Sequence, residues 1–257
     1  MSQLLNIITV TKDDYDGVEV TIRSTEKIRK HQNVTQFIID SSGEDTKEKV
    51  RALADSADNV VYHWLEPVGI AAAFNLGLNH ASSELVWLLN GGDQIRPDVN
   101  LDNLLYVLQK SSADAIIFQN EFSGNKEIAK HPPMWAMWPP VLAWIPHPAT
   151  FTRRSLYGKY GQFDESFTIA MDYEFWLRCF SKNVTVDTVS IPLTLFDPNG
   201  IAATQVSLRN KETFCSIKRH LGNLIRLWLY NFTLITKAWR IYRKGSIKKA
   251  LKGVLKK

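Results

Sequence analysis

The side chains best suited to chemistry in this 257-residue chain are carboxylates that stand beside aromatic residues. Asp172 and Glu174 flank Tyr173 at the start of a predicted helix. Partial desolvation there would raise the pKa of a carboxyl group toward neutrality, as a general base requires. Acids in a first helical turn are also ordinary partners of the helix dipole. The residue types alone leave both roles open.

A second acidic position is Asp93, which ends the run Asn90-Gly91-Gly92-Asp93 after an apolar segment. An Asp at the end of a strand can coordinate Mg²⁺ or Mn²⁺, which complete their shell with phosphate oxygens and water. The two glycines would let the backbone approach a diphosphate closely. The same residues suit a plain turn, because Gly-Gly and Gly-Asp favour positive φ. The motif therefore predicts either a cation and diphosphate site or a turn.

A third candidate region begins with a stretch rich in Pro and Trp at residues 127–148. So many prolines exclude a regular helix or a central strand. The indoles predict either a loop packed on the core or a lip that binds an acceptor or dips into a membrane. If the loop closes on a nucleotide, His147 could contact a phosphate or the cation, and Arg153 or Arg154 could offset the diphosphate charge. Such residues more commonly have structural or solvent-facing roles.

Alternating strands and helices would position these residues. Strands are predicted over short apolar runs at residues 4–10, 34–40, 59–63, 84–90 and 114–119, and helices between them at 17–30, 46–56, 69–81 and 100–111. Further helices at 153–160 and 170–181 and strands at 184–186 and 189–195 follow. This alternation predicts an α/β fold with a largely parallel sheet covered on both faces. Ligands of such sheets bind beyond the carboxyl ends of the strands.

Two nucleotide-binding motifs are absent from the sequence. Neither the dinucleotide pattern Gly-x-Gly-x-x-Gly nor the phosphate-loop signature Gly-Lys-Ser/Thr occurs. A dinucleotide oxidoreductase or an ordinary ATPase is therefore disfavoured. A nucleotide held by side chains and a divalent cation remains compatible with the sequence.

Charge divides the chain near residue 212. Residues 1–212 carry 19 Lys or Arg and 26 Asp or Glu, whereas residues 213–257 carry 12 Lys or Arg and no acid. We therefore predict a catalytic domain at 1–212 and a basic amphipathic helical tail at 213–257. Basic residues, flanking indoles and the lack of acids favour a helix on anionic lipid. A helix that closes the core is the alternative for the first turns of the tail, and RNA binding for its last ten residues.

The expected location is the cytoplasm, on the inner face of the membrane. The amino terminus lacks the basic region of a secretory signal. The longest apolar run of the tail, between residues 226 and 237, is about half of the ~20 residues that cross a bilayer. The two cysteines form neither a disulfide framework nor a metal-ligand pair, which suits a reducing compartment.

Six segments, in this order, resemble glycosyltransferase family 2, the inverting family with the GT-A fold, over about residues 4–212. The family's first strand S-I-I-T-V-T-x-N is matched by NIITVTK at 6–12, and its D-x-x-S-x-D-x-T-like run by DSSGEDT at 40–46. Its G-I-x-x-A-x-N-x-G helix is matched by GIAAAFNLG at 69–77, and its L-N-x-D-D strand end by LLNGGD at 88–93. HPATFTRRSLYGKYGQFDESF at 147–167 and AMDYEFWLR at 170–178 resemble the H-x-A-x-F-x-R-R, G-x-F-D-E-x-F and D-Y-D/E-x-x-x-R segments.

The resemblance implies a donor site made of Thr9, Thr11, Asp40, Asn75, Asn90 and Asp93. Asp40 would contact uracil or another base, and Asp93 would hold Mg²⁺ or Mn²⁺. Gly92 stands where the family's metal motif carries a second acid. The family's catalytic aspartate corresponds to Asp172, which would deprotonate an acceptor hydroxyl as it attacks the anomeric carbon with inversion. The cation would stabilise the leaving diphosphate. Glu174 would support this base or bind the acceptor.

The sequence thus predicts a membrane-peripheral glycosyltransferase that moves a hexosyl or N-acetylhexosaminyl group from a UDP-sugar to a hydroxyl of a growing, lipid-linked surface glycan such as an O-antigen. One alternative is a nucleotidyltransferase, disfavoured because no Gly-rich basic loop follows the first strand. Another is a non-catalytic module that binds nucleic acid through the tail. The acidic body argues against nucleic acid as a partner.

Overall fold

The protein is described by a computed structural model at residues 3–31, 33–122, 128–129, 145–180, 182, 184–196 and 204–222. Most of the Pro- and Trp-rich stretch, and residues 223–257 of the predicted tail, lie outside the described residues. What the sequence predicts for those two segments stays a prediction.

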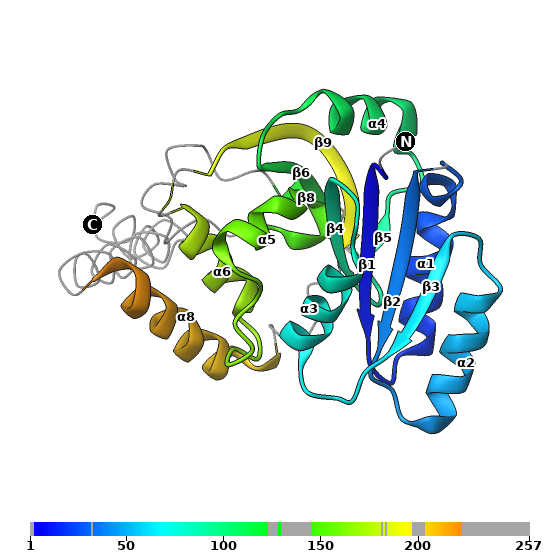
Figure 1. Ribbon diagram of the computed structural model, residues 1–257, viewed down its shortest axis with the longest axis horizontal. Coiled ribbons are helices and arrows are strands. Elements are labelled where there is room, and N and C mark those ends of the chain that lie inside the picture. Colours follow the sequence, from blue (N-terminus) through cyan, green and yellow to red (C-terminus); the bar gives the residue numbers. More distant parts are fainter. Residues whose placement is uncertain are drawn as a thin grey trace, which may run out of the picture.

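Strands and helices alternate regularly through the first half of the chain (Figure 1). The order there is β1 (Leu5–Thr11), α1 (Tyr15–Arg29), β2 (Val34–Asp40), α2 (Glu44–Asp55), β3 (Val60–Trp64), α3 (Ile70–His80), β4 (Leu85–Asn90), β5 (Gln94–Ile95), α4 (Leu101–Lys110) and β6 (Ala115–Phe122). The second half contains β7 (Ile128–Ala129), the 3-10 helix η3 (His147–Ala149), β8 (Thr150–Arg153), α5 (Arg154–Tyr160), α6 (Met171–Phe180), β9 (Val186–Phe196) and α8 (Val206–Leu221). The predicted alternation of the first half is confirmed, with ends shifted by up to three residues.

The strands form one sheet in the order β3-β2-β1-β4-β8-β6-β9-β5, with β7 paired to β6. β1 pairs in parallel with β2 on one side and with β4 on the other. Successive strands are thus added first on one side of β1 and then on the other. Thr11 lies opposite Asp40, and Val10 lies opposite Asn90. The carboxyl ends of three strands therefore meet at one switch point, where open α/β sheets bind ligands. The α/β class and the largely parallel sheet are confirmed, and its antiparallel members are the short strands β5, β7 and β8.

Helices cover both faces of the sheet, as alternate residues of β1 show. Ile8 and Val10 belong to the core shared with α3, α5 and α6, whereas Leu5 and Ile7 belong to the core beneath α4. A third cluster packs α1 and α2 against Ile38 of β2. All of β1 is buried, as expected of a central parallel strand with helices on both sides.

Glycine brings α3 close to the sheet. A Cβ atom at Gly77 would lie 2.3 Å from Cγ2 of Ile8, a separation that no side chain tolerates. Only glycine therefore permits this packing of α3 on β1. The close approach fixes Asn75 and the start of α3, where Ile70 and Ala73 face the ligand cavity described below.

The second half departs from the predicted elements in two ways. The predicted strands at 184–186 and 189–195 are one strand, β9, whose pairing with β6 shifts register between Phe118 and Asn120. This irregularity accommodates Pro192, which cannot donate to a regular ladder. The strands β7 and β8, like β5 in the first half, were absent from the prediction because two to four residues are too short for a periodic pattern.

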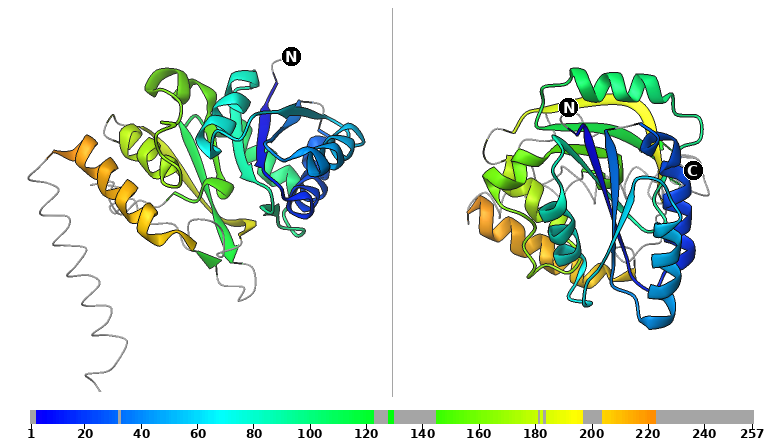
Figure 2. Two further views of the ribbon diagram at one scale, coloured as in Figure 1. Left: turned by 90° about the horizontal axis from the view of Figure 1, so that it is seen from below. Right: turned by 45° about the vertical axis from the view of Figure 1, so that its right-hand side comes forward.

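α8 crosses the predicted division between residues 212 and 213 and packs on α6. Figures 1 and 2 both place it on the outer side of α6, at the end of the molecule away from α1 and α2. Residues 213–221 thus belong to a helix that closes onto the body, which was the alternative for the first turns of the tail. Among the helices that the structure describes, none has the length and apolar composition needed to cross a membrane.

Candidate active site

A cavity of about 510 Å³ lies at the switch point of the sheet. Thr11 at the end of β1 and Asn90 at the end of β4 line it. His147 on η3 and Asp172 at the start of α6 line the same cavity. The fold therefore brings together four of the predicted site residues from distant parts of the chain.

Asp172 is placed to accept a proton from a ligand in this cavity. Its side chain is 24% exposed, and Oδ2 lies 3.9 Å from Nδ1 of His147. Oδ1 accepts the N–H of Tyr173 at 2.6 Å. Burial raises the pKa of Asp172 to about 6, although hydrogen bonds from backbone N–H groups oppose the rise. The carboxylate is therefore ionised at neutral pH and still basic enough for general-base chemistry.

His147 stands between the two acids of the site. Its Nε2 lies 2.9 Å from Nδ2 of Asn90 and 3.8 Å from Oδ2 of Asp93. Because an amide nitrogen can only donate, Nε2 is the acceptor and the ring proton sits on Nδ1, toward Asp172. Burial lowers the pKa of His147 to about 4, so the ring is neutral. A neutral imidazole with this tautomer turns its N–H toward Asp172 at 3.9 Å and leaves the charge of the carboxylate unneutralised.

Asp93 closes the turn that follows β4. It is buried, and its Oδ2 accepts the N–H of Asn90 at 2.7 Å. Its backbone oxygen accepts the hydroxyl of Thr21 at 2.8 Å, which fixes the turn against α1. Gly92 has a φ of +97°, a region that favours glycine. Burial raises the pKa of Asp93 to about 7. The turn role that the residue types left open is therefore present.

The N–H of Asn90 donates to Oδ2 of the same carboxylate, so Oδ1 is the oxygen that a cation would use. Nε2 of His147 is already engaged by Asn90 and has no lone pair to offer. The described part of the chain holds no group of three or more His, Cys, Asp or Glu side chains placed to bind a metal. A divalent cation here would therefore depend on Asp93 Oδ1, a bound diphosphate and water, which fits the habits of Mg²⁺ and Mn²⁺.

The donor-binding candidates on β1 and β2 are placed differently from one another. Thr11 lines the cavity. Thr9 is buried and accepts a hydrogen bond from Nε2 of Gln36 at 2.9 Å. Asp40 is buried as well, and its Oδ2 accepts the hydroxyl of Tyr62 at 2.9 Å. Thr9 and Asp40 are not among the described lining residues. The contacts predicted for them with a base stay predictions.

Asn75 connects α3 to the loop that leads into α6. Its Nδ2 donates to the backbone oxygen of Phe163 at 3.0 Å and to Oε1 of Glu165 at 2.9 Å, and its Oδ1 accepts the N–H of Phe163 at 3.0 Å. Because its amide is fully engaged, Asn75 positions the α6 side of the site. It is not among the described residues that line the cavity.

Arg153 and Arg154 lie at the opposite edge of the sheet. Nε of Arg153 donates to the backbone oxygen of Ala113 at 2.9 Å, and its guanidinium pairs with Glu84. Nε of Arg154 donates to the backbone oxygen of Ser83 at 3.0 Å. These partners precede β4 and β6 and so mark the amino ends of the strands. The structure does not bring either arginine to the cavity.

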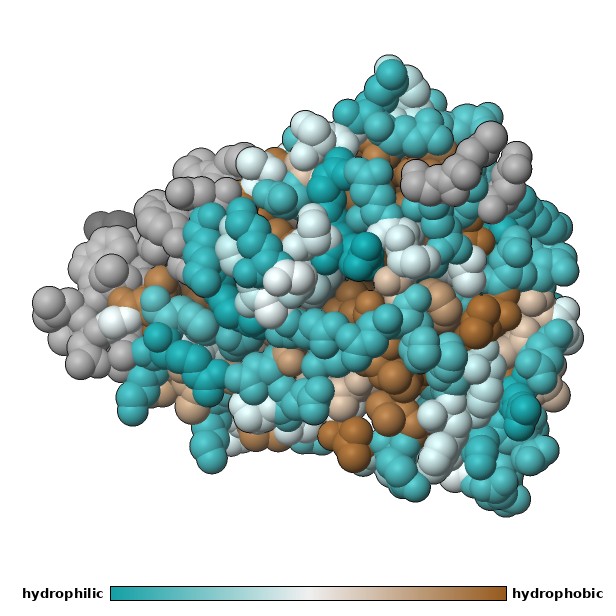
Figure 3. Space-filling view, viewed as in Figure 1, coloured by the Kyte–Doolittle hydropathy of each residue, from teal (hydrophilic) through white to brown (hydrophobic). Residues whose placement is uncertain are grey.

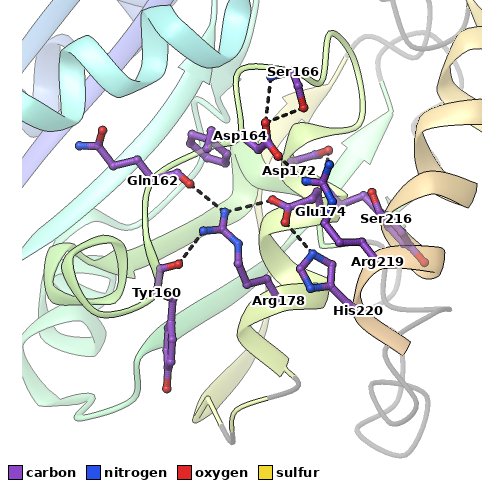
Figure 4. Close-up of polar contacts among 12 residues, drawn as sticks. Tyr160, Gln162, Asp164, Ser166, Asp172, Glu174, Arg178, Ser216, Arg219 and His220 are labelled. Atoms are coloured by element: carbon purple, nitrogen blue, oxygen red, sulfur yellow. Dashed lines mark hydrogen bonds and ion pairs between the residues drawn. The ribbon is translucent and has the colours of Figure 1, made fainter. Parts of the chain in front are cut away.

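Glu174 joins α6 to α8, as Figure 4 shows. It is 2% exposed, and its Oε2 accepts from Nη2 of Arg178 at 3.0 Å while its Oε1 lies 2.7 Å from Nε2 of His220. Arg178 also donates to the backbone oxygens of Tyr160 at 2.5 Å and Gln162 at 2.8 Å. Glu174 therefore supports the helix of Asp172, which was one of its two predicted roles, and the described cavity lining does not include it.

Glu212 on α8 holds the start of α6. Its carboxylate accepts the N–H groups of Thr168, Ile169 and Ala170 at 2.8, 2.9 and 2.8 Å, directly before the first residue of α6. A buried carboxylate there satisfies free donors and suits the positive end of the helix dipole. Sequence reasoning missed this residue because it belongs to no motif. The only signal is that it is the last acid before the acid-free tail.

Four further polar residues line the cavity and had no predicted role: Lys12, Asp14, Ser41 and Asn120. The first three directly follow β1 or β2, so the rule that ligands bind at strand ends would have found them. Asn120 lies inside β6, where no such rule applies.

Apolar side chains make up most of the remaining wall, including Ile145, Ile169, Met171 and Phe196. In Figure 3, apolar residues (brown) are exposed within a largely hydrophilic surface near α3 and the loop before it. Val68 in that loop is 63% exposed. An apolar wall with a few converging polar groups is typical of small-molecule sites.

Comparisons with known proteins give this geometry a context. The sequence model of glycosyl transferase family 2 matches residues 6–177. Two uncharacterized glycosyltransferases of Mycobacterium tuberculosis, from strains CDC 1551 and H37Rv, are each 27% identical over 91% of this chain and 89% of their own length.

Among solved structures, the fold is similar to that of Staphylococcus aureus TarS, with a TM-score of 0.64 at 12% identity. That match covers 86% of this chain but only 40% of TarS. Structures of TarS residues 1–349 in complex with UDP and with UDP-GlcNAc match at TM-scores of 0.62 and 0.63, each at 13% identity over 86% of this chain and 67% or 68% of theirs. This likeness identifies the GT-A fold.

Proposed function

The chain belongs to glycosyl transferase family 2, and from this premise we propose that it transfers a sugar with inversion from a UDP-sugar to an acceptor hydroxyl. The observation that carries the proposal is the carboxylate of Asp172 in a cavity at the switch point, with Nδ1 of a neutral His147 3.9 Å away. The choice of UDP is supported by the solved TarS complexes with UDP and UDP-GlcNAc. The sugar is a hexosyl or N-acetylhexosaminyl group.

In the proposed reaction the acceptor oxygen attacks the anomeric carbon while Asp172 takes the hydroxyl proton. One C–O bond forms, the bond from the anomeric carbon to the diphosphate breaks, and the configuration inverts. A carboxyl group with a pKa of about 6 is ionised before the reaction and basic enough to assist the attack. The N–H of Tyr173 holds the other oxygen of the carboxylate at 2.6 Å.

The leaving diphosphate needs positive charge. A divalent cation at Oδ1 of Asp93 would stabilise that charge when bound. Lys12, which lines the cavity just after β1, would add a cationic side chain from the protein itself.

The proposed acceptor is a lipid-linked glycan at the inner face of the cytoplasmic membrane. Support comes from the sequence of residues 213–257, with its 12 basic and no acidic residues, which favours an anionic surface. The active-site motifs all lie before this segment, so the tail would bring the enzyme to its acceptor and leave the chemistry to the body.

A thermal-shift panel tests the proposed donor. The full-length protein is heated with UDP, GDP, CDP, TDP or ADP, each with and without Mn²⁺. We expect UDP to raise the melting temperature most, and Mn²⁺ to increase that rise, because a ligand that binds only the folded state stabilises it by mass action. Equal shifts with all five nucleotides, or none, would contradict the proposed donor.

A further inference from the structure

Asn120 of β6 is a buried amide without a hydrogen-bond partner. It is 1% exposed and lines the cavity. Neither its Nδ2 nor its Oδ1 is hydrogen-bonded within the described part of the chain. Thr194, its register partner on β9, is fully buried, and its hydroxyl also lacks a partner there. Buried polar groups are normally paired, so two neighbouring unpaired ones call for an explanation.

The place of Asn120 in the sheet indicates which ligand it faces. Thr11 and Ser41 line the cavity from the ends of β1 and β2, where a nucleotide binds in switch-point folds. Asn120 and Phe196 line it from β6 and β9, on the other side of β4 and β8. In an inverting displacement the acceptor approaches from the side opposite the leaving group. Asn120 is therefore on the acceptor side.

We propose that Asn120 binds a hydroxyl group of an acceptor sugar, with Oδ1 accepting from it and Nδ2 donating to its neighbour. An amide offers both functions, and so does each hydroxyl of a sugar. This inference rests on the proposed function and adds a specificity-determining contact to it. A site built to hydrogen-bond a hydroxyl rejects an analogue that lacks it, because the buried amide is then left unpaired.

The unliganded protein gives a first test, since the proposal requires an amide with no partner inside the protein. Asn120→Leu keeps the approximate size and removes both polar atoms, and Asn120→Ala controls for overpacking. We expect at least one of the two variants to melt at or above the wild-type temperature, because removal of an unpaired polar group is not destabilising. A fall of more than about 5 °C in both variants would mean that the amide has a partner within the protein, and would overturn the proposal.

Kinetics of the full-length enzyme give a second test. UDP release from UDP-glucose, UDP-galactose and UDP-GlcNAc is followed in water and with a panel of methyl glycosides as acceptors. In Asn120→Leu we expect the acceptor KM to rise about tenfold or more, while UDP affinity and release to water stay within about twofold of wild type. Gln119→Leu, at the partly exposed neighbouring position outside the described cavity lining, is the matched control and should change neither.

A deoxy-glycoside identifies the hydroxyl. The analogue that lacks this hydroxyl should be a poor acceptor for the wild type. Its KM should not rise further in Asn120→Leu, because the deoxy analogue and the substitution each remove the same contact. An unchanged acceptor KM, a loss of UDP affinity, or a wild type that binds UDP but uses none of the glycosides would overturn the proposal. A wild type that binds no nucleoside diphosphate would instead refute the proposed function.

Discussion

The two sides of the cavity are assembled by different kinds of contact. β1, β2 and β4 belong to the βα units of the first half, and β1 pairs in parallel with both β2 and β4. Backbone pairing therefore brings Thr11, Asp40 and Asn90 to one edge of the sheet. The other side draws on β6, β8 and β9, whose pairing mixes directions and shifts register. There Asp172 stands on a helix that side chains of α8 hold in place.

This difference separates binding from catalysis. The backbone pairing of β1, β2 and β4 depends little on any one side chain. A substitution at the ends of these strands should therefore alter donor affinity only through the contacts that the replaced side chain made with the donor. On the α6 side, Glu212 and His220 of α8 hold the helix that carries the base. Substitutions there should alter the geometry of Asp172, and hence the rate, while the donor still binds.

The largest expected effect belongs to Asp172→Asn. The amide keeps the size and polarity of the side chain but cannot accept the acceptor's proton, so transfer should fall by about 10²- to 10⁴-fold. UDP affinity should stay near that of the wild type, because the lost function concerns the acceptor. Transfer rates and UDP calorimetry measure the two, with Asp102→Asn on the exposed side of α4 as the control. Wild-type transfer by the variant would remove Asp172 from the mechanism.

Asp93→Ala should act on the donor side. We expect UDP affinity in Mn²⁺ to fall about tenfold or more, and affinity without metal to change little, because one carboxylate carries the proposed cation. The melting temperature should change only slightly at pH 8. The variant loses the hydrogen bond to Asn90, but it also removes an acid whose pKa of about 7 shows that burial disfavours its ionised form. A large loss of stability with unchanged metal-dependent binding would leave only the turn role.

The sequence predicts the β1–β4 side well because its signals are local. Seven consecutive buried residues in β1, and the polar residues that follow it, can be read without knowing the partner strands. The other side depends on long-range pairing. β5 and β8 are too short to give a sequence pattern, and Asn120 is recognised as a candidate only because its buried amide has no partner in the described structure.

Contacts between distant segments explain the remaining differences between the sequence-based predictions and the structure. Glu212 was placed at the end of a domain because the charge of the chain changes there, yet its three hydrogen bonds reach residues 168–170. Arg153 and Arg154 belong to a motif beside His147, but β8 runs from the cavity toward the amino ends of its neighbours and carries both arginines away from the site. A sequence motif gives the order of residues, and only strand direction decides which edge they reach.

The pH dependence of transfer tests the electrostatics of the α6 side. Burial raises the pKa of Asp172 to about 6, and the active form is the deprotonated one, so the rate should be constant above about pH 7 and fall below pH 6. Near pH 5 the rate should be about tenfold lower. His147, with a pKa of about 4, stays neutral across this range. A profile of kcat from pH 5 to 8 that shows no loss on the acid side would contradict Asp172 as the base.

Glu212→Gln should give a smaller loss that separates positioning from stability. The variant keeps one acceptor oxygen for three N–H groups and turns an amide NH₂ toward them. We expect kcat to fall several-fold, the free energy of unfolding to fall by about 1–2 kcal/mol, and UDP affinity to stay unchanged. Lys211→Ala, an exposed change on the same helix, should do none of this. Lower stability with an unchanged kcat would make Glu212 a purely structural residue.

The smallest catalytic effect, and the clearest separation of location from chemistry, should come from removing residues 223–257. A chain that ends at Gly222 keeps α8 and its contacts to Glu174 and the start of α6, so it should stay folded and bind UDP like the full chain. It loses ten of the twelve basic residues of the tail, each contributing about 1 kcal/mol near an anionic surface, and should stop sedimenting with anionic liposomes.

The matched variant is the full chain with five lysines of the tail replaced by Gln: Lys248, Lys249, Lys252, Lys256 and Lys257. It should bind liposomes more weakly but not lose binding altogether, because the apolar residues remain. High salt should likewise weaken the full chain only in part, since apolar contacts are not screened. If the shortened chain sediments as well as the full chain, or if the tail prefers RNA to lipid, the membrane role of the tail fails while the assignments of Asp172 and Asp93 stand.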